Sequence, residues 1–132
     1  MGFNYLIDTN ILIYVSKDQI PSENLTKVQQ IFRNSFNISV INEIELLGGR
    51  NIDEQKYIYF KKFLSLSNVY HLNDEIKLQT IEIRRKFNLK TPDAIIGATA
   101  LVNNFILVTR NTKDFNRIDG LEIYNPFEIK EL

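Results

Sequence analysis

Residues 91–109 read TPDAIIGATALVNNFILVT, and this stretch decides the class of fold that the rest of the chain must match. It begins with Thr91 as a hydroxyl cap and Pro92 at the first helical position, where a missing N–H costs nothing. Residues 94–102 are almost all apolar and rich in small side chains, which predicts a buried helix packed close to a sheet. Residues 105–109 then give an apolar strand.

The rest of the chain alternates between strand and helix patterns in the same way. Further strands are predicted over residues 3–7, 37–41, 69–72 and 121–124. Further helices are predicted over residues 11–15 and 53–66, and another begins at Asn73. Two more are predicted from their caps: one begins after Ser22, and one begins after Asn42 and ends at Gly48 and Gly49. Such alternation favours a parallel sheet covered on both faces. We therefore predict a three-layer α/β/α fold with four to five parallel strands, formed by residues 1–132 as a single domain.

Composition excludes some classes of function. The chain has no cysteine, which rules out disulfides and thiolate metal sites. No apolar run approaches the ~20 residues that span a bilayer, and the N-terminal residues lack the pattern of a signal peptide. These observations predict a cytoplasmic protein without a membrane segment. The sixteen basic and sixteen acidic residues cancel, so net charge does not indicate nucleic-acid binding.

Two aspartates lie where a parallel sheet usually binds its ligands, outside the carboxyl ends of the strands. Asp8 directly follows the first predicted strand, and a buried carboxylate there is costly unless it is paired or binds a metal. Capping of the next helix is the alternative role for Asp8. Asp93 lies in the first turn of the buried helix, where the helix dipole also favours aspartate. Sequence position alone leaves both alternatives open.

Other oxygen-bearing residues follow the second and fourth predicted strands. Glu43 and Glu45 would point to nearly opposite sides of a helix, and Glu45 could instead form a capping box with Asn42. At the end of the fourth strand, Asn111 and Asp114 lie in a polar loop near Thr109. The pattern suggests a carboxylate site without choosing its members.

Four blocks of the chain together resemble the PIN-domain nucleases, most closely the VapC-type toxins of toxin–antitoxin pairs. The blocks are Asp8-Thr9-Asn10, Asn42-Glu43-Ile44-Glu45-Leu46, Thr91-Pro92-Asp93-Ala94, and Thr109-Arg110-Asn111 through Asp114-Phe115. They occur in the expected order along essentially the whole chain. The departure is Asn42, because a hydroxyl residue is usual at that position, and this leaves Glu43 as a second choice to Glu45.

The resemblance implies a metal-dependent endoribonuclease with Mg²⁺, or alternatively Mn²⁺, as its cofactor. Asp8 and Asp93 would bind the metal, Glu45 would bind a second ion or position the attacking water, and Asn111 or Asp114 would complete the site. Expected partners are an RNA substrate, a cognate antitoxin and a second copy in a homodimer. The alternatives are a PIN-like RNA- or protein-binding module and a housekeeping RNA-processing nuclease.

Histidine and the basic residues add less to this hypothesis. The chain has one histidine, His71, in a predicted strand, and no paired histidines at metal-binding spacing, so zinc is disfavoured. Two basic clusters could contact an RNA backbone or could form ordinary solvated surface. They are Arg84, Arg85, Lys86 and Lys90, and Arg110, Lys113 and Arg117.

Overall fold

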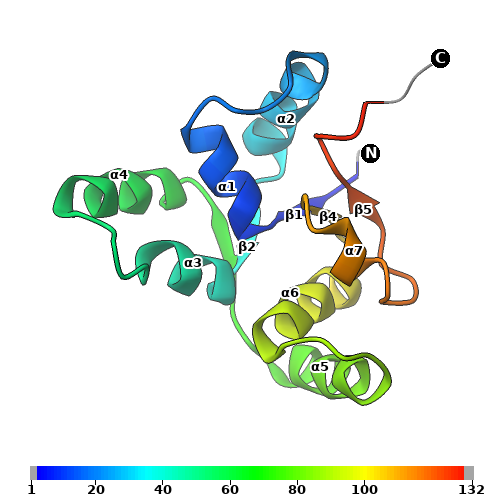
Figure 1. The fold of residues 1–132 in the computed structure, drawn as a ribbon. Helices are drawn as coiled ribbons and strands as arrows, with labels where there is room; N and C mark the ends of the chain where they lie inside the picture. The colour runs from blue at the N-terminus through cyan, green and yellow to red at the C-terminus, as the bar shows by residue number, and fades with distance from the viewer. Residues whose placement is uncertain (1–2, 130–132) are drawn as a thin grey trace.

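The computed structural model describes residues 3–129, which contain one five-stranded parallel sheet in the order β3-β2-β1-β4-β5 (Figure 1). The strands are β1 (Tyr5–Ile7), β2 (Asn37–Ser39), β3 (Asn68–Tyr70), β4 (Ile106–Val108) and β5 (Ile123–Tyr124). Each adjacent pair is parallel, as in the pairing of Leu6 with Leu107 between β1 and β4. The prediction of four to five parallel strands is confirmed.

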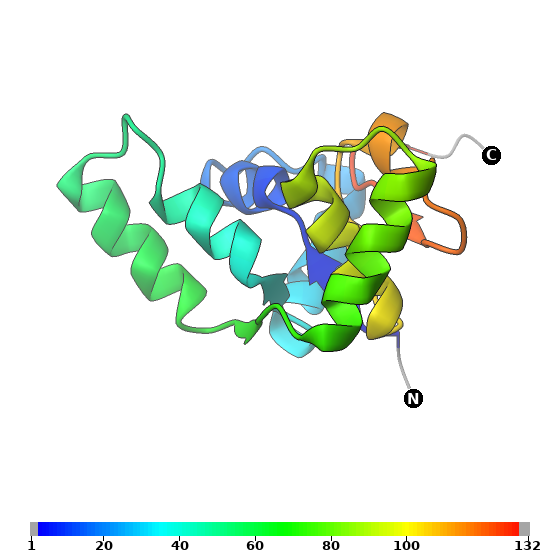
Figure 2. The same cartoon turned by 90° about the horizontal axis from the view of Figure 1, so that it is seen from below.

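Helices cover both faces of this sheet, so the predicted three-layer arrangement is also confirmed. They are α1 (Thr9–Ser16), α2 (Ser22–Asn34), α3 (Val40–Leu47), α4 (Glu54–Leu64), α5 (Asp74–Lys86), α6 (Thr91–Val102) and α7 (Thr112–Phe115). Helices α1 to α4 pack on one face and α5 to α7 on the other, as the two buried clusters of side chains show. Figure 2 shows α4 and α5 at opposite ends of the molecule.

Side chains that alternate in direction along the strands divide the core in two. Leu6 of β1 and Leu107 of β4 are buried beneath α5 and α6, whereas Ile7 and Val108 are buried beneath α1 to α4. Successive side chains of a strand point to opposite faces, so two neighbouring apolar residues serve two separate cores. This explains why these strands are continuous apolar runs.

The small side chains of α6 allow it to lie close to its neighbours, as the sequence predicted. Ala94, Ala98 and Ala100 are fully buried. A Cβ atom on Gly97 would lie only 2.6 Å from the Cδ1 of Ile118, so a larger residue here would force the end of the Ile118 side chain to move. Close packing of this kind fixes the N-terminal end of α6, where Asp93 lies.

The start of α3 differs from the prediction. Ser39, not Asn42, is the N-cap, and residues 40 and 41 belong to the helix rather than to the preceding strand. The Ser39 hydroxyl accepts a hydrogen bond from the N–H of Ile41, while the Oδ1 of Asn42 accepts one from the N–H of Ser39. This capping box satisfies two backbone donors at once, which outweighs the apolar strand pattern of residues 40 and 41.

Two other helices begin one residue earlier than predicted. The N-cap positions are Pro21 for α2 and Lys90 for α6, and neither makes a side-chain capping bond. Ser22 and Thr91 are therefore the first helical residues, and Pro92 is the second residue of α6. The four-residue helix α7 was not predicted, because it is too short to show a helical period. Within residues 3–129, no helix combines the length and apolar character needed to cross a membrane.

Candidate active site

The candidate site lies at the carboxyl ends of the three central strands β1, β2 and β4. From β1 the chain builds outward to β2 and β3, and it then returns to β4 on the other side of β1. Ligands of parallel sheets bind where the strand order reverses in this way. Figure 1 shows helices α1, α3, α6 and α7 arranged around these strands.

Asp8 is a buried carboxylate at the end of β1, with only 6% of its surface exposed. It caps α1 by accepting a 2.8 Å hydrogen bond from the N–H of Thr9, so the capping role predicted as an alternative is real. Its second oxygen accepts a 2.8 Å bond from the hydroxyl of Thr109. Weaker contacts come from the amide groups of Asn10 at 3.2 Å and Asn42 at 3.4 Å. These donors hold the carboxylate in a fixed orientation.

The charge on Asp8 is nevertheless costly. The pKa of Asp8 is raised from 3.8 to about 6, chiefly by burial. The hydrogen bonds from Thr109 and Thr9 lower the pKa, and the nearby charges of Glu45 and Asp93 raise it. A carboxylate in this state favours a proton or a cation beside it. Strong pKa perturbation in a polar crevice is typical of functional sites.

Glu45 reaches the site from α3 and belongs to the same hydrogen-bond chain. The Thr9 hydroxyl donates to Oε1 of Glu45 at 2.8 Å and accepts from Nδ2 of Asn42 at 3.0 Å. Glu45 raises the pKa values of both Asp8 and Asp93.

Glu43 faces another part of the molecule. It lines a hollow of about 300 Å³ beside α4, together with Lys61 and Leu64. The structure thus brings Glu45, and not Glu43, to the carboxylates of the central strands.

Asp93 is half-buried at the start of α6. Burial raises its pKa, as do the charges of Glu45 and Asp114, whereas Lys90 lowers it. Asp114 of α7 is therefore close enough to Asp93 to add its charge to the cluster.

Asn111 supports the cluster from the loop before α7. Its side-chain amide donates to Oδ2 of Asp114 at 3.2 Å, and its backbone N–H donates to the hydroxyl of Thr109 at 3.0 Å. Asp114 thus adds its charge near Asp93, and Asn111 holds the Asp114 carboxylate by a hydrogen bond.

Asn42 has a role here that sequence reasoning missed. It is fully buried, and its amide orientation is fixed because Oδ1 accepts from the Ser39 N–H, which leaves Nδ2 to donate to Asp8 and Thr9. The available signal was the spacing of Ser39 and Asn42, three residues apart as in a capping box.

The donor set fits a hard divalent cation. The converging groups are carboxylates, and oxygen ligands are the ones that Mg²⁺ and Mn²⁺ prefer. Within residues 3–129, no three histidine, cysteine, aspartate or glutamate side chains come close enough to surround an ion by themselves. Mg²⁺ usually takes only one or two protein carboxylates and retains several waters, so the cluster remains compatible with it.

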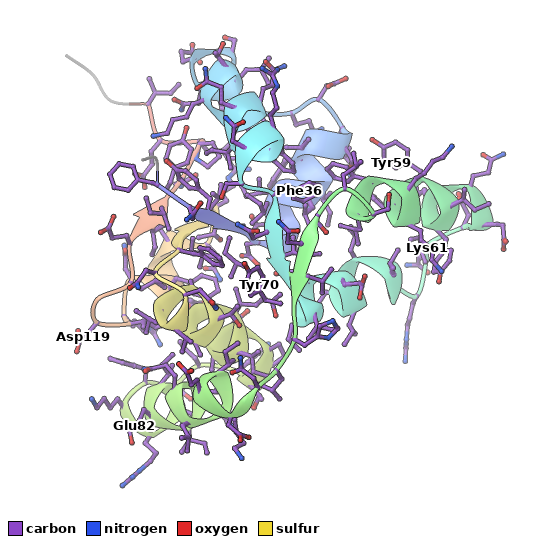
Figure 3. All side chains as sticks on the ribbon, turned by 180° about the vertical axis from the view of Figure 1, so that it is seen from behind. Phe36, Tyr59, Lys61, Tyr70, Glu82 and Asp119 are labelled. Atoms are coloured by element: carbon purple, nitrogen blue, oxygen red, sulfur yellow. The ribbon has the colours of Figure 1, made fainter. Side chains whose placement is uncertain are left out.

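Of the basic residues singled out in the sequence, Lys90 acts on the cluster through Asp93, whereas Arg110 and Arg85 have other contacts. Arg110 is exposed, stacks 4.2 Å over the ring of Phe127 and donates to the hydroxyl of Tyr14 at 2.9 Å. On α5, Arg85 lies 4.0 Å from Glu82, which Figure 3 labels at the edge of the molecule. His71 is exposed directly after β3 rather than within a strand.

Comparison with known proteins assigns the family. The PIN domain profile matches residues 5–121. Ribonuclease VapC1 of Rickettsia felis is 30% identical over 129 residues, with 89% of this chain and 92% of that protein covered.

Two solved structures extend the similarity to three dimensions. A chain of a toxin–antitoxin complex from Klebsiella pneumoniae is 32% identical, with a TM-score of 0.76 over 96% of this chain and 100% of that one. A chain of VapBC2 from Rickettsia felis, bound to a DNA fragment from its promoter, is 26% identical, with a TM-score of 0.80 over 93% and 98%. The chain therefore belongs to the PIN-domain family, as a nuclease of the VapC type.

Proposed function

We propose that this protein is a divalent-metal-dependent endoribonuclease and the toxin of a type II toxin–antitoxin pair. The observation that carries the proposal is the buried carboxylate of Asp8, whose pKa is raised to about 6 beside Glu45 and Asp93. The relatives named ribonuclease VapC and the structural neighbour from a toxin–antitoxin complex support the choice of RNA and of a toxin role.

Each residue of the cluster has a proposed role that follows from its position. Asp8 and Asp93 would hold Mg²⁺ or Mn²⁺, which lowers the pKa of a bound water and neutralises charge on the phosphate. Glu45 would bind a second ion or orient the attacking water, and the Thr9 hydroxyl fixes the side chain of Glu45 for this purpose. Asp114, oriented by Asn111, would complete the site.

Partners and location belong to the same proposal. The toxin–antitoxin complexes among the structural neighbours support a cognate antitoxin for this chain, and a homodimer and a cytoplasmic location would accompany that role. A binding module without catalysis is disfavoured, because the carboxylate cluster is intact. Nothing in residues 3–129 favours a housekeeping processing enzyme over a toxin.

RNA cleavage by the purified protein tests the proposal. Structured RNA is incubated with Mg²⁺ and wild type, Asp8→Asn, Asp93→Asn or Asp119→Asn, with EDTA in a parallel reaction. Asp119 is exposed and lies outside the cluster, so its variant is the matched control for loss of one carboxylate. We expect metal-dependent cleavage by wild type and Asp119→Asn only.

A second readout does not depend on activity. Mg²⁺ should raise the thermal midpoint of wild type, since a ligand that binds only the folded state stabilises it, and Asp8→Asn should remove most of that rise. Equal cleavage by all four proteins, or a wild-type thermal midpoint that does not change in millimolar Mg²⁺, would refute the assignment.

A further inference from the structure

A groove leads away from the candidate site between α1, α3 and α4. Its volume is about 500 Å³, within the range of ligand-binding clefts. Glu45 is one of the lining residues, so the groove adjoins the carboxylate cluster at this side chain. Any polymer whose backbone is cut at the cluster must leave the site along some surface, and this groove shares the side chain of Glu45 with the site.

Three cations line the groove, namely Lys17 after α1, Arg50 in the loop between α3 and α4, and Lys56 in the first turns of α4. All three are exposed. The only ion pairs within 4.0 Å among residues 3–129 lie on α5, so these cations have no carboxylate partner there. Glu45 is the single acidic residue of the lining, so basic residues outnumber acidic ones among the residues that line the groove.

Aromatic and apolar side chains fill the space between these cations. Tyr59 and Phe60 of α4 line the groove, and Tyr59 has 52% of its surface exposed. Ile13 and Ile52 complete the apolar surface. Figure 3 shows Tyr59 and Lys61 on opposite sides of α4, which separates this groove from the hollow that Glu43 and Lys61 line.

We propose that this groove holds the single-stranded part of the RNA substrate next to the cut, with Lys17, Arg50 and Lys56 on phosphates and Tyr59 stacked on a base. Unpaired cations beside exposed aromatic rings are the combination that binds single strands without reading their sequence. The inference rests on the proposed function, because it names the path of that substrate. An acidic segment of a protein partner is the competing occupant, and the exposed ring of Tyr59 beside the cations favours stacked bases over such a segment.

Equilibrium binding of a fluorescein-labelled oligouridine tests the groove, with EDTA present to prevent metal-dependent cleavage. The groove variant carries Lys17→Gln, Arg50→Gln and Lys56→Gln. The matched control removes three cations from the opposite end of the molecule, with Lys77→Gln, Arg85→Gln and Lys86→Gln on α5. Both variants lose the same net charge.

Salt dependence gives the decisive number. Each phosphate contact contributes about 0.7 to the slope of log affinity against log salt for single strands, so the groove variant should have a slope shallower by about 2. Its affinity should fall roughly 10- to 100-fold at low salt, while the control stays close to wild type. Tyr59→Ala should weaken binding at least about fivefold with the salt slope unchanged.

Each other outcome overturns the inference. Equal losses in the groove variant and the control would mean that only total charge matters. Unchanged RNA binding by the groove variant, with lost affinity for the cognate antitoxin of the proposed pair, would make the groove a protein-docking site. If wild type cleaves the oligouridine in Mg²⁺ while all groove variants bind normally, only the groove assignment fails. If wild type neither binds nor cleaves RNA, the proposed function fails with it.

Discussion

The pH dependence of folding stability is a direct consequence of the environment of Asp8. Its folded-state pKa is about 6, against 3.8 for the free group, so the folded protein binds this proton more tightly than the unfolded chain. The folded state is therefore penalised at high pH, and the penalty is relieved as pH falls through about 6 towards 3.8. At one pKa unit per 1.36 kcal/mol, the full effect is about 3 kcal/mol.

Only part of this pH range can be used without protonating other carboxylates. Between about pH 7.5 and about pH 5 the linkage adds on the order of 1 kcal/mol to the free energy of unfolding of metal-free wild type. Asp8→Asn cannot titrate at this position and should lose that gain. Asp93, whose pKa is also raised, is present in both proteins, and its contribution largely cancels in the difference.

Urea denaturation followed by circular dichroism, in EDTA at several pH values, measures the effect. Asp119→Asn, which removes an exposed carboxylate, should follow wild type. Stability curves that run parallel for wild type and Asp8→Asn would refute the reasoning, since the buried carboxylate would then carry no penalty. Excess Mg²⁺ should flatten the wild-type curve above about pH 6, because a bound cation offsets the same charge.

Three further predictions follow from individual contacts. Glu45→Gln should lower RNA cleavage at least about tenfold, whereas Glu43→Gln should leave it within about twofold of wild type in the same cleavage assay. Asn42→Asp keeps the capping acceptor but places a second charge against the neighbouring buried aspartate. Calorimetric titration should then show an altered Mn²⁺ affinity, and the free energy of unfolding in EDTA should fall by about 1–3 kcal/mol. Unchanged values for both quantities would contradict the hydrogen-bond chain. Gly97→Ala forces a Cβ into the side chain of Ile118 and should cost about 1–3 kcal/mol in urea denaturation, while a neutral result would mean that this contact relaxes freely.

The sequence predicted the layers of the fold because apolar periodicity reports burial directly. Residues 91–109 contain a buried helix and a buried strand, and both are observed as α6 and β4. The start of α3 was wrong for a physical reason: Val40 and Ile41 look like a strand continuing from β2, yet the capping box of Ser39 and Asn42 turns the chain into a helix first. Local hydrogen bonds decide boundaries that hydrophobic pattern cannot.

Site residues were harder to predict than the fold, because their partners are distant in the chain. Asp8 bonds to Thr109 across 101 positions, and Thr9 bonds to Glu45 across 36. Spacing within one helix could show that Glu43 and Glu45 diverge, but only the packing of α1 against α3 shows that Thr9 selects Glu45. The resemblance to PIN-domain nucleases supplied that choice before any geometry was available.

The balanced net charge conceals two opposite fields. Four of the sixteen acidic residues, Asp8, Glu45, Asp93 and Asp114, gather at one end of the central strands, which leaves twelve acidic against sixteen basic residues elsewhere. The carboxylate cluster alone repels a polyanion, so a strand of RNA requires compensating cations along the surface that it follows. The groove beside Glu45 supplies such cations, and they have no carboxylate partner within 4.0 Å among residues 3–129. On α5, by contrast, Lys77 and Arg85 are paired with carboxylates. Charge distribution relative to the site, rather than total charge, therefore decides whether this surface can attract RNA.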